Sequence, residues 1–152
     1  MDAEAARVQI EEIDRLKKGK RLTLLFDGWE DKLRRSLYGT VTAQVGEYPT
    51  VLSLDDLTGH CGSANKYLET AKKAMKNMEI EDGWNIIALT TDNPTVMQSF
   101  RGKFKSDYHW VLVRNMSQST IQMEYLIRIC RYLHVFCMDL IPSSEKFLPT
   151  QL

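Results

Sequence analysis

Two aspartates occupy positions at which a metal-dependent active site could form. Asp27 follows a short apolar run at residues 22–26, and Asp92 follows a second such run at residues 84–89 after two threonines. If the two runs are neighbouring strands, both carboxylates lie at one edge of the sheet. Carboxylate oxygens are hard ligands that hold Mg²⁺ or Mn²⁺ against phosphate oxygens, and two such cations about 3.5–4 Å apart promote phosphodiester chemistry. The pair therefore predicts a catalytic metal site that needs a further acid from a later helix.

The same residues also have a structural interpretation. Asp27 could belong to a polar turn, and Asp92 could support the cap of a helix that starts with Asn93 as N-cap and Pro94 at its first position. Spacing alone favours this second interpretation, because short motif matches outnumber real sites. The adjacent acids Asp55 and Asp56 are expected to be solvated.

A second candidate metal site lies late in the chain. Three soft ligands fall at spacings of four and three, on one face of an expected helix: Cys130, His134 and Cys137. A tetrahedral zinc site needs a fourth ligand, so His60 or Cys61 would have to come close. Buried apolar cysteines and a hydrogen-bonded histidine in a core helix are the favoured interpretation.

The first half of the chain predicts a helix followed by three strands. Apolar residues at helical spacing within residues 1–20 end at Lys17-Lys18-Gly19, which is typical of a helix C-terminus. The apolar run at 22–26 is continuous, which indicates a central strand covered on both faces. Alternation at 36–45, a turn, and a β-rich run at 48–54 that contains Pro49 predict a meander whose third strand is at an edge.

In the second half of the chain, the spacing of apolar residues predicts helices that alternate with strands. Ser63 caps a helix with an apolar side of Leu68, Ala71, Met75 and Met78. A strand at 84–89 then precedes a helix with Val96, Phe100 and Phe104 on one face, a strand at 110–113 and a long apolar helix at 119–140.

This order predicts an α/β fold with a mixed five-stranded sheet, in which three antiparallel strands are followed by parallel crossovers and helices cover both faces. The ribonuclease-H-like arrangement satisfies it, with the first strand central beside the fourth. A flavodoxin-like fold fits less well, because no helix separates the first three strands. We expect a packed helix at residues 1–20, the domain at 21–141, without its C-terminal part, and a tail at 142–152.

Composition excludes several classes of function. The 152 residues suit one domain, and 20 basic and 20 acidic side chains cancel, so nucleic acid would need a local cationic patch. The basic clusters at 17–21 and 34–35 are expected to be solvated. Three cysteines favour a reducing intracellular compartment, and there is no signal-peptide pattern. Charges within residues 121–141 argue against a membrane span, and no motif indicates a small-molecule substrate.

Three segments together resemble hAT-type transposases, and more narrowly an uncharacterised domain of fungal and plant transposase-like proteins. They are residues 24–29 (LLFDGW), 91–101 (TDNPTVMQSFR) and 110–112 (WVL). The resemblance spans about residues 21–113 and implies that Asp27 and Asp92 are the first two acids of an Asp-Asp-Glu triad. It further implies metal-dependent DNA phosphoryl transfer with Mg²⁺ or Mn²⁺ and a nuclear location. Gly28 and Trp29 match the motif without an implied catalytic role.

Three departures indicate that this chain does not cut DNA by itself. The family's glutamate lies far downstream, and Glu124 and Glu145 sit in no matching motif. The family's Cys-Phe-Leu-His motif is matched only by residues 131–134, displaced and with Arg131 in place of the cysteine. The family's zinc finger and dimerisation region have no counterpart, so the chain is expected to be truncated or rearranged.

The sequence thus leaves three hypotheses. The first is a transposase-derived domain with weak cation binding and no independent activity. The second is a non-catalytic module that binds a protein partner through the apolar helix at 119–140. The third is a degenerate transposon fragment without a selected role.

Overall fold

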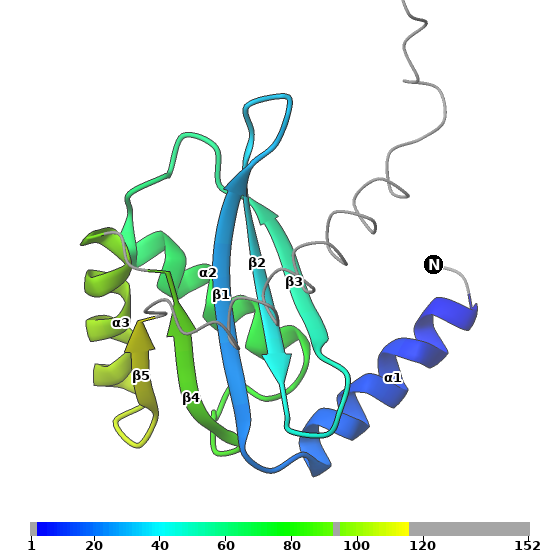
Figure 1. The fold of residues 1–152 in the computed structure, drawn as a ribbon. Helices are drawn as coiled ribbons and strands as arrows, with labels where there is room; N and C mark the ends of the chain where they lie inside the picture. The colour runs from blue at the N-terminus through cyan, green and yellow to red at the C-terminus, as the bar shows by residue number, and fades with distance from the viewer. Residues whose placement is uncertain (1–2, 93–94, 116–152) are drawn as a thin grey trace, which may run out of the picture. The chain divides into compact units, whose positions relative to one another are not determined.

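The computed structural model describes residues 3–92 and 95–115, which fall within one compact unit (Figure 1). Its elements are α1 (Ala3–Lys18), β1 (Leu22–Glu30), β2 (Ser36–Ala43), β3 (Thr50–Asp56), α2 (Ala64–Asn77), β4 (Ile86–Thr91), α3 (Thr95–Asp107) and β5 (Leu112–Asn115).

The five strands form one mixed sheet in the order β3-β2-β1-β4-β5. The first three strands are an antiparallel meander. The next two, β4 and β5, run parallel to β1, because each is reached through a helical crossover. This is the ribonuclease-H-like strand order that the sequence predicts, with β1 central and β4 beside it.

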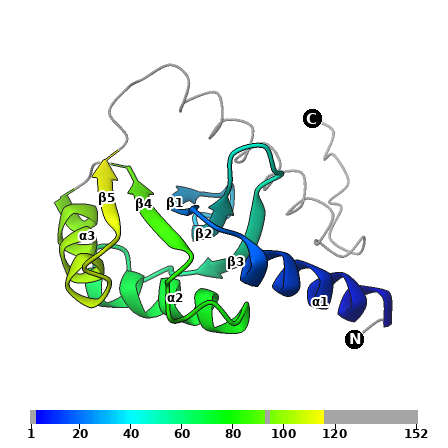
Figure 2. The ribbon, with the colours of Figure 1, turned by 90° about the horizontal axis from the view of Figure 1, so that it is seen from below.

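The main core lies between the sheet and two helices. Figure 2 shows α2 and α3 on the same side of the sheet. Alternate residues of β1 face these helices, since the ring of Phe26 lies 5.7 Å from that of Tyr67 in α2 and 5.0 Å from that of Phe100 in α3. Phe26 and Phe100 are both fully buried. Strand alternation therefore places the following residue, Asp27, on the opposite face.

The centre of that opposite face is buried as well. Leu25 is 9% exposed and its partner across β2, Val41, is 2% exposed. The continuous apolar run of β1 is therefore explained by burial on both faces, as predicted. The apolar helix expected at residues 119–140 lies outside the described residues.

The last three strands begin two residues later than the sequence predicts, and β3 begins at Thr50 instead of residue 48. The fourth strand begins at Ile86 and the fifth at Leu112, whereas both were predicted to begin with a tryptophan. Trp84 and Trp110 instead belong to turns, in which Ile86 N–H donates to Gly83 C=O and Val111 N–H donates to Tyr108 C=O. The two indole rings stack at a centroid distance of 4.4 Å, so their size serves a turn–turn contact and not the sheet.

Candidate metal and catalytic site

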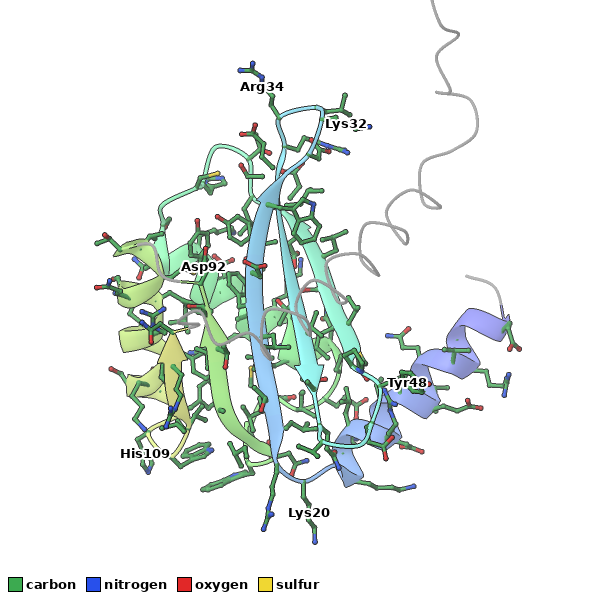
Figure 3. All side chains as sticks on the ribbon, in the orientation of Figure 1. Lys20, Lys32, Arg34, Tyr48, Asp92 and His109 are labelled. Atoms are coloured by element: carbon green, nitrogen blue, oxygen red, sulfur yellow. The ribbon has the colours of Figure 1, made fainter. Side chains whose placement is uncertain are left out.

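The register of the parallel strands brings the two predicted acids to neighbouring positions. Phe26 of β1 pairs with Thr91 of β4, so Asp27 is the next residue of β1 and Asp92 directly follows the end of β4. Figure 3 shows Asp92 at the end of β4 beside β1. The strand adjacency on which the predicted site depends is therefore present in the fold.

Asp27 lies inside a strand and not after its end, so the polar-turn interpretation is wrong. The β1–β2 ladder pairs Asp27 with Gly39 and continues to Glu30, opposite Ser36. It therefore runs past the end of β4. Asp27 Oδ1 accepts a hydrogen bond from the Gly28 N–H at 2.9 Å. The carboxylate is consequently held on a rigid, paired segment of backbone.

Gly28 leaves the space that a tyrosine ring occupies. A Cβ at this position would lie 2.3 Å from a ring carbon of Tyr38. That ring stacks on Phe26 at 5.5 Å, and the Tyr38 and Tyr67 hydroxyls are hydrogen-bonded at 2.7 Å. The glycine of the Asp-Gly-Trp motif thus has a packing role directly beside the candidate acid. Burial, followed by the Tyr67 hydrogen bond, raises the pKa of Tyr38, so its hydroxyl stays protonated at neutral pH.

Asp92 is electrostatically unfavourable in the ionised form. Burial raises the pKa of its carboxyl, and the charge of Asp27 raises it further, while the charge of Arg101 lowers it. Its Oδ1 atom is buried and has no hydrogen-bond partner among the described residues. A buried carboxylate oxygen close to a second carboxylate is stabilised by a proton or by a cation. The arrangement is therefore chemically suited to a hard divalent ion.

Arg101 is a functional candidate that the sequence reasoning did not single out. From α3, its Nη1 donates to Thr91 Oγ1 at 2.8 Å and to the Asp92 C=O at 2.7 Å. The Thr91 hydroxyl also donates to that carbonyl at 2.8 Å. These bonds tie the end of β4 to the helix and fix the backbone of Asp92. No sequence signal separates Arg101 from Lys103 and Lys105, the other cations of the same helix.

The two carboxylates are not joined by a third ligand in the part of the chain that the structure describes. Within residues 3–92 and 95–115, no group of three or more His, Cys, Asp or Glu side chains could hold a metal ion. Glu124 and Glu145, the glutamates considered from the sequence, lie outside these ranges. Two carboxylates of this kind fit a weakly held Mg²⁺ or Mn²⁺, since tighter sites use more oxygen ligands.

The prediction that Asp55 and Asp56 are both solvated is half correct. Asp56 is exposed and accepts hydrogen bonds from the Thr58 N–H and hydroxyl. Asp55 is partly buried, and its Oδ2 has no hydrogen-bond partner among the described residues. Both residues pair with β2, Asp55 with Tyr38 and Asp56 with Leu37, so strand alternation places their side chains on opposite faces of the sheet.

The soft-ligand cluster cannot be placed, because Cys130, His134 and Cys137 lie outside the described residues. His60 and Cys61 are exposed in the β3–α2 connection, where Cys61 Sγ donates to the Leu57 C=O at 3.6 Å. The helix expected at 119–140, on which the interaction-module hypothesis depends, also lies outside the described residues.

The basic clusters are solvated, as predicted. Lys18, Lys20 and Arg21 are exposed, Lys17 forms an ion pair with Glu79, and the Arg35 guanidinium binds the Asp31 carboxylate at 2.7 Å. Among the residues that the structure describes, no helix is long and apolar enough to cross a bilayer. Residues 121–141, which the sequence analysis considered as a possible membrane span, lie outside the described residues.

Comparison with known proteins shows a likeness to solved structures. No protein-family model and no curated protein matches the sequence. Among solved structures, the chain is similar to the catalytic core domain of BIV integrase, at 10% sequence identity and a TM-score of 0.45. The likeness covers 77% of this chain and 72% of that one. The strand order and strand directions of this chain define its ribonuclease-H-like fold.

Proposed function

We propose that this chain is a transposase-derived ribonuclease-H-like domain, related to the hAT type, in which Asp27 and Asp92 bind Mg²⁺ or Mn²⁺. The observation that supports it most directly is the buried, unpaired Oδ1 of Asp92 beside the charge of Asp27. Structural carboxylates that are buried normally find hydrogen-bond donors or cationic partners. Leaving one oxygen unpaired next to a like charge reduces stability, and a cation-binding role explains why the arrangement exists.

The roles of the chain's own residues follow from their contacts. The β1–β2 pairing and the Gly28 N–H hold Asp27, while Arg101 and Thr91 hold the backbone of Asp92. The two carboxylates would then supply oxygen ligands from fixed positions. A bound cation would neutralise phosphate oxygens and lower the pKa of a water that attacks the phosphodiester.

The isolated chain is proposed to lack DNA-cleaving activity. Phosphoryl transfer with a loosely held cation is inefficient, because catalysis depends on fixed placement of charge against the reacting phosphate. The proposed partner, DNA, and the proposed location, the nucleus, rest on the family resemblance alone.

A direct test is a titration with Mn²⁺ in which electron paramagnetic resonance measures the free ion. We expect the wild-type chain to bind with a dissociation constant of about 1 mM, the weak end of the range for protein oxygen sites. The double variant Asp27→Asn/Asp92→Asn should bind at least about tenfold more weakly, because both anionic ligands become neutral amides.

The matched control neutralises two exposed acids far from the site in sequence, Glu47→Gln/Glu69→Gln. It removes the same amount of charge, so it corrects for non-specific attraction of cations. Equal binding by the wild type and the aspartate double variant would refute the proposal. Metal-dependent nicking of duplex DNA by the isolated chain would refute the proposal that the chain alone does not cleave DNA.

A further inference from the structure

Three buried oxygen atoms of the β2–β3 strand pair have no hydrogen-bond partner among the described residues. They are Thr40 Oγ1, Ser53 Oγ and Asp55 Oδ2. Thr40 is 0% exposed. Native proteins pair nearly all of their buried polar atoms with protein groups or with ordered water, because an unpaired atom costs free energy. Three such atoms in one strand pair therefore indicate a shared cause.

The register of the sheet places the three side chains on one face. Tyr38 and Thr40 are two residues apart in β2 and so share a face. Across the ladder, the first pairs with Asp55 and the second with Ser53, and directly opposite residues also share a face. The ring of Tyr38 lies 4.7 Å from that of Tyr67 in α2. The three oxygen-bearing side chains are therefore on the side of the sheet that α2 covers (Figure 2).

The spacing of these side chains suits a bridge between them. Directly opposite residues have Cβ atoms about 5 Å apart, and Ser53 and Asp55 are about 7 Å apart along β3. One water molecule joins two polar atoms that are about 5.6 Å apart. The pairing also shifts from Ser53 to Val51 between two successive residues of β2, so β3 has an additional residue, Leu52, and the ladder is locally disrupted beside the two hydroxyl groups.

We propose that Thr40, Ser53 and Asp55 bind one buried water molecule between the sheet and α2. The water donates one hydrogen bond to Asp55 Oδ2 and one to a hydroxyl oxygen, and it accepts a hydrogen bond from the other hydroxyl group. Three hydrogen bonds are typical of a buried water, and all three oxygen atoms are then paired. A Mg²⁺ or Ca²⁺ ion fits less well, because it needs about six or more oxygen ligands.

The bound water adds a side-chain link between two strands of which one is at the edge of the sheet. The edge strand β3 has β2 as its neighbour in the sheet, and the water joins the two strands in addition to their ladder. The site faces α2, whereas Asp27 lies on the opposite face of the sheet. Its occupancy is therefore independent of the proposed cation site.

Thr40→Val in the full chain tests the site through the sign of its effect on Tm. Valine has nearly the same shape as threonine and is also β-branched, so the change removes the hydroxyl group alone. With the water bound, the remaining partners lose a hydrogen bond, and the Tm should fall by about 3–6 °C. Without the water, the change removes an unpaired buried hydroxyl group, and the Tm should rise. A rise would overturn the proposal.

Thr42→Val is the matched control on the same strand and the same face. Thr42 is 1% exposed, and its hydroxyl group donates to the Thr50 C=O at 3.5 Å, a long hydrogen bond. Because such a bond is weak, the Tm of this variant should change less than that of Thr40→Val. An equal fall in the two variants would show that any buried threonine of β2 gives this effect, and it would overturn the proposal.

Magnetic relaxation dispersion of ¹⁷O-labelled water detects the bound molecule directly, because it counts long-lived internal waters. The wild type and Thr42→Val should have equal counts, and Thr40→Val should have about one fewer. A direct hydrogen bond between the Thr40 and Ser53 hydroxyl groups would also lower the Tm of Thr40→Val. It would leave the count unchanged, and that result would overturn the proposal.

Discussion

The two ends of β4 differ in how well their polar side-chain atoms are hydrogen-bonded. Figure 3 shows Asp92 at one end and His109 near the other. At the first end, a buried carboxylate oxygen has no hydrogen-bond partner among the described residues and lies beside a like charge. At the other end, the polar atoms of two large aromatic side chains, Tyr108 and Trp110, are paired. Tyr108 donates its hydroxyl proton to the Glu81 C=O at 3.0 Å, and Trp110 donates its Nε1–H to the Gly83 C=O at 3.2 Å.

This contrast distinguishes a region that supports stability from one that supports function. Paired donors, stacked rings and a tight glycine turn lower the free energy of the folded state. An unpaired buried oxygen raises it, and such exceptions to good packing concentrate at functional sites. We therefore expect substitutions at the aromatic end to change stability without changing cation binding, and substitutions at the acid end to change both.

The largest effect is expected from Trp110→Ala at the aromatic end. The variant loses the stack on Trp84 and the bond to Gly83, so the free energy of unfolding should fall by about 3 kcal/mol. Urea unfolding followed by circular dichroism measures it. The Mn²⁺ affinity of the folded variant should equal that of the wild type. A matching loss of affinity would contradict the separation of the two ends.

Gly28→Ala should have the next largest effect and links packing to the acid site. The added methyl group would meet the Tyr38 ring at 2.3 Å, so the ring must move and stability should fall by about 1–3 kcal/mol. Combining Gly28→Ala with Tyr38→Ala opens space for the methyl group, and the double variant should lose less than the sum of the two single losses. Strict additivity in a double-mutant cycle would show that the ring is not the obstacle.

The smallest effect, and the only stabilising one, is expected from Asp92→Asn. The amide removes the repulsion with Asp27, which should add about 0.5–1 kcal/mol at pH 7 because solvent screens part of the interaction. The folded-state pKa of Asp92 is raised, so the folded protein binds a proton more readily than the unfolded chain does. Wild-type stability should therefore increase as the pH falls from neutrality through the raised pKa to the unfolded value.

Thermal unfolding from pH 7 to pH 4 compares the wild type with Asp92→Asn. The difference in stability between the two should shrink as the pH falls, since the wild-type carboxyl becomes neutral by protonation. Exposed Glu69→Gln provides the reference for a loss of charge elsewhere on the surface. A variant less stable than the wild type at neutral pH would mean that the Asp92 carboxylate is satisfied in the folded state.

The strand order could be predicted because it depends on hydrophobic period and connection length. The continuous apolar run before Asp27 indicates a strand buried on both faces, and short connections indicate a meander. The position of Asp27 within its strand could not be predicted, since it depends on where β2 begins to pair. The role of Arg101 was equally hidden, because a hydrogen bond to the end of another element leaves no periodic signal. The size and apolar character of Trp84 and Trp110 predicted strands, although both belong to turns.

The antiparallel meander and the parallel addition of β4 have different consequences for folding. The strands β1, β2 and β3 are joined by short turns and can associate early at little entropic cost. The contact of β1 with β4 closes a loop that includes two more strands and α2. Asp27 lies in β1 and Asp92 follows β4, so the two carboxylates come close together only when β1 pairs with β4 and this long loop closes. The acid pair therefore forms with the complete sheet, and not with any single hairpin or helix.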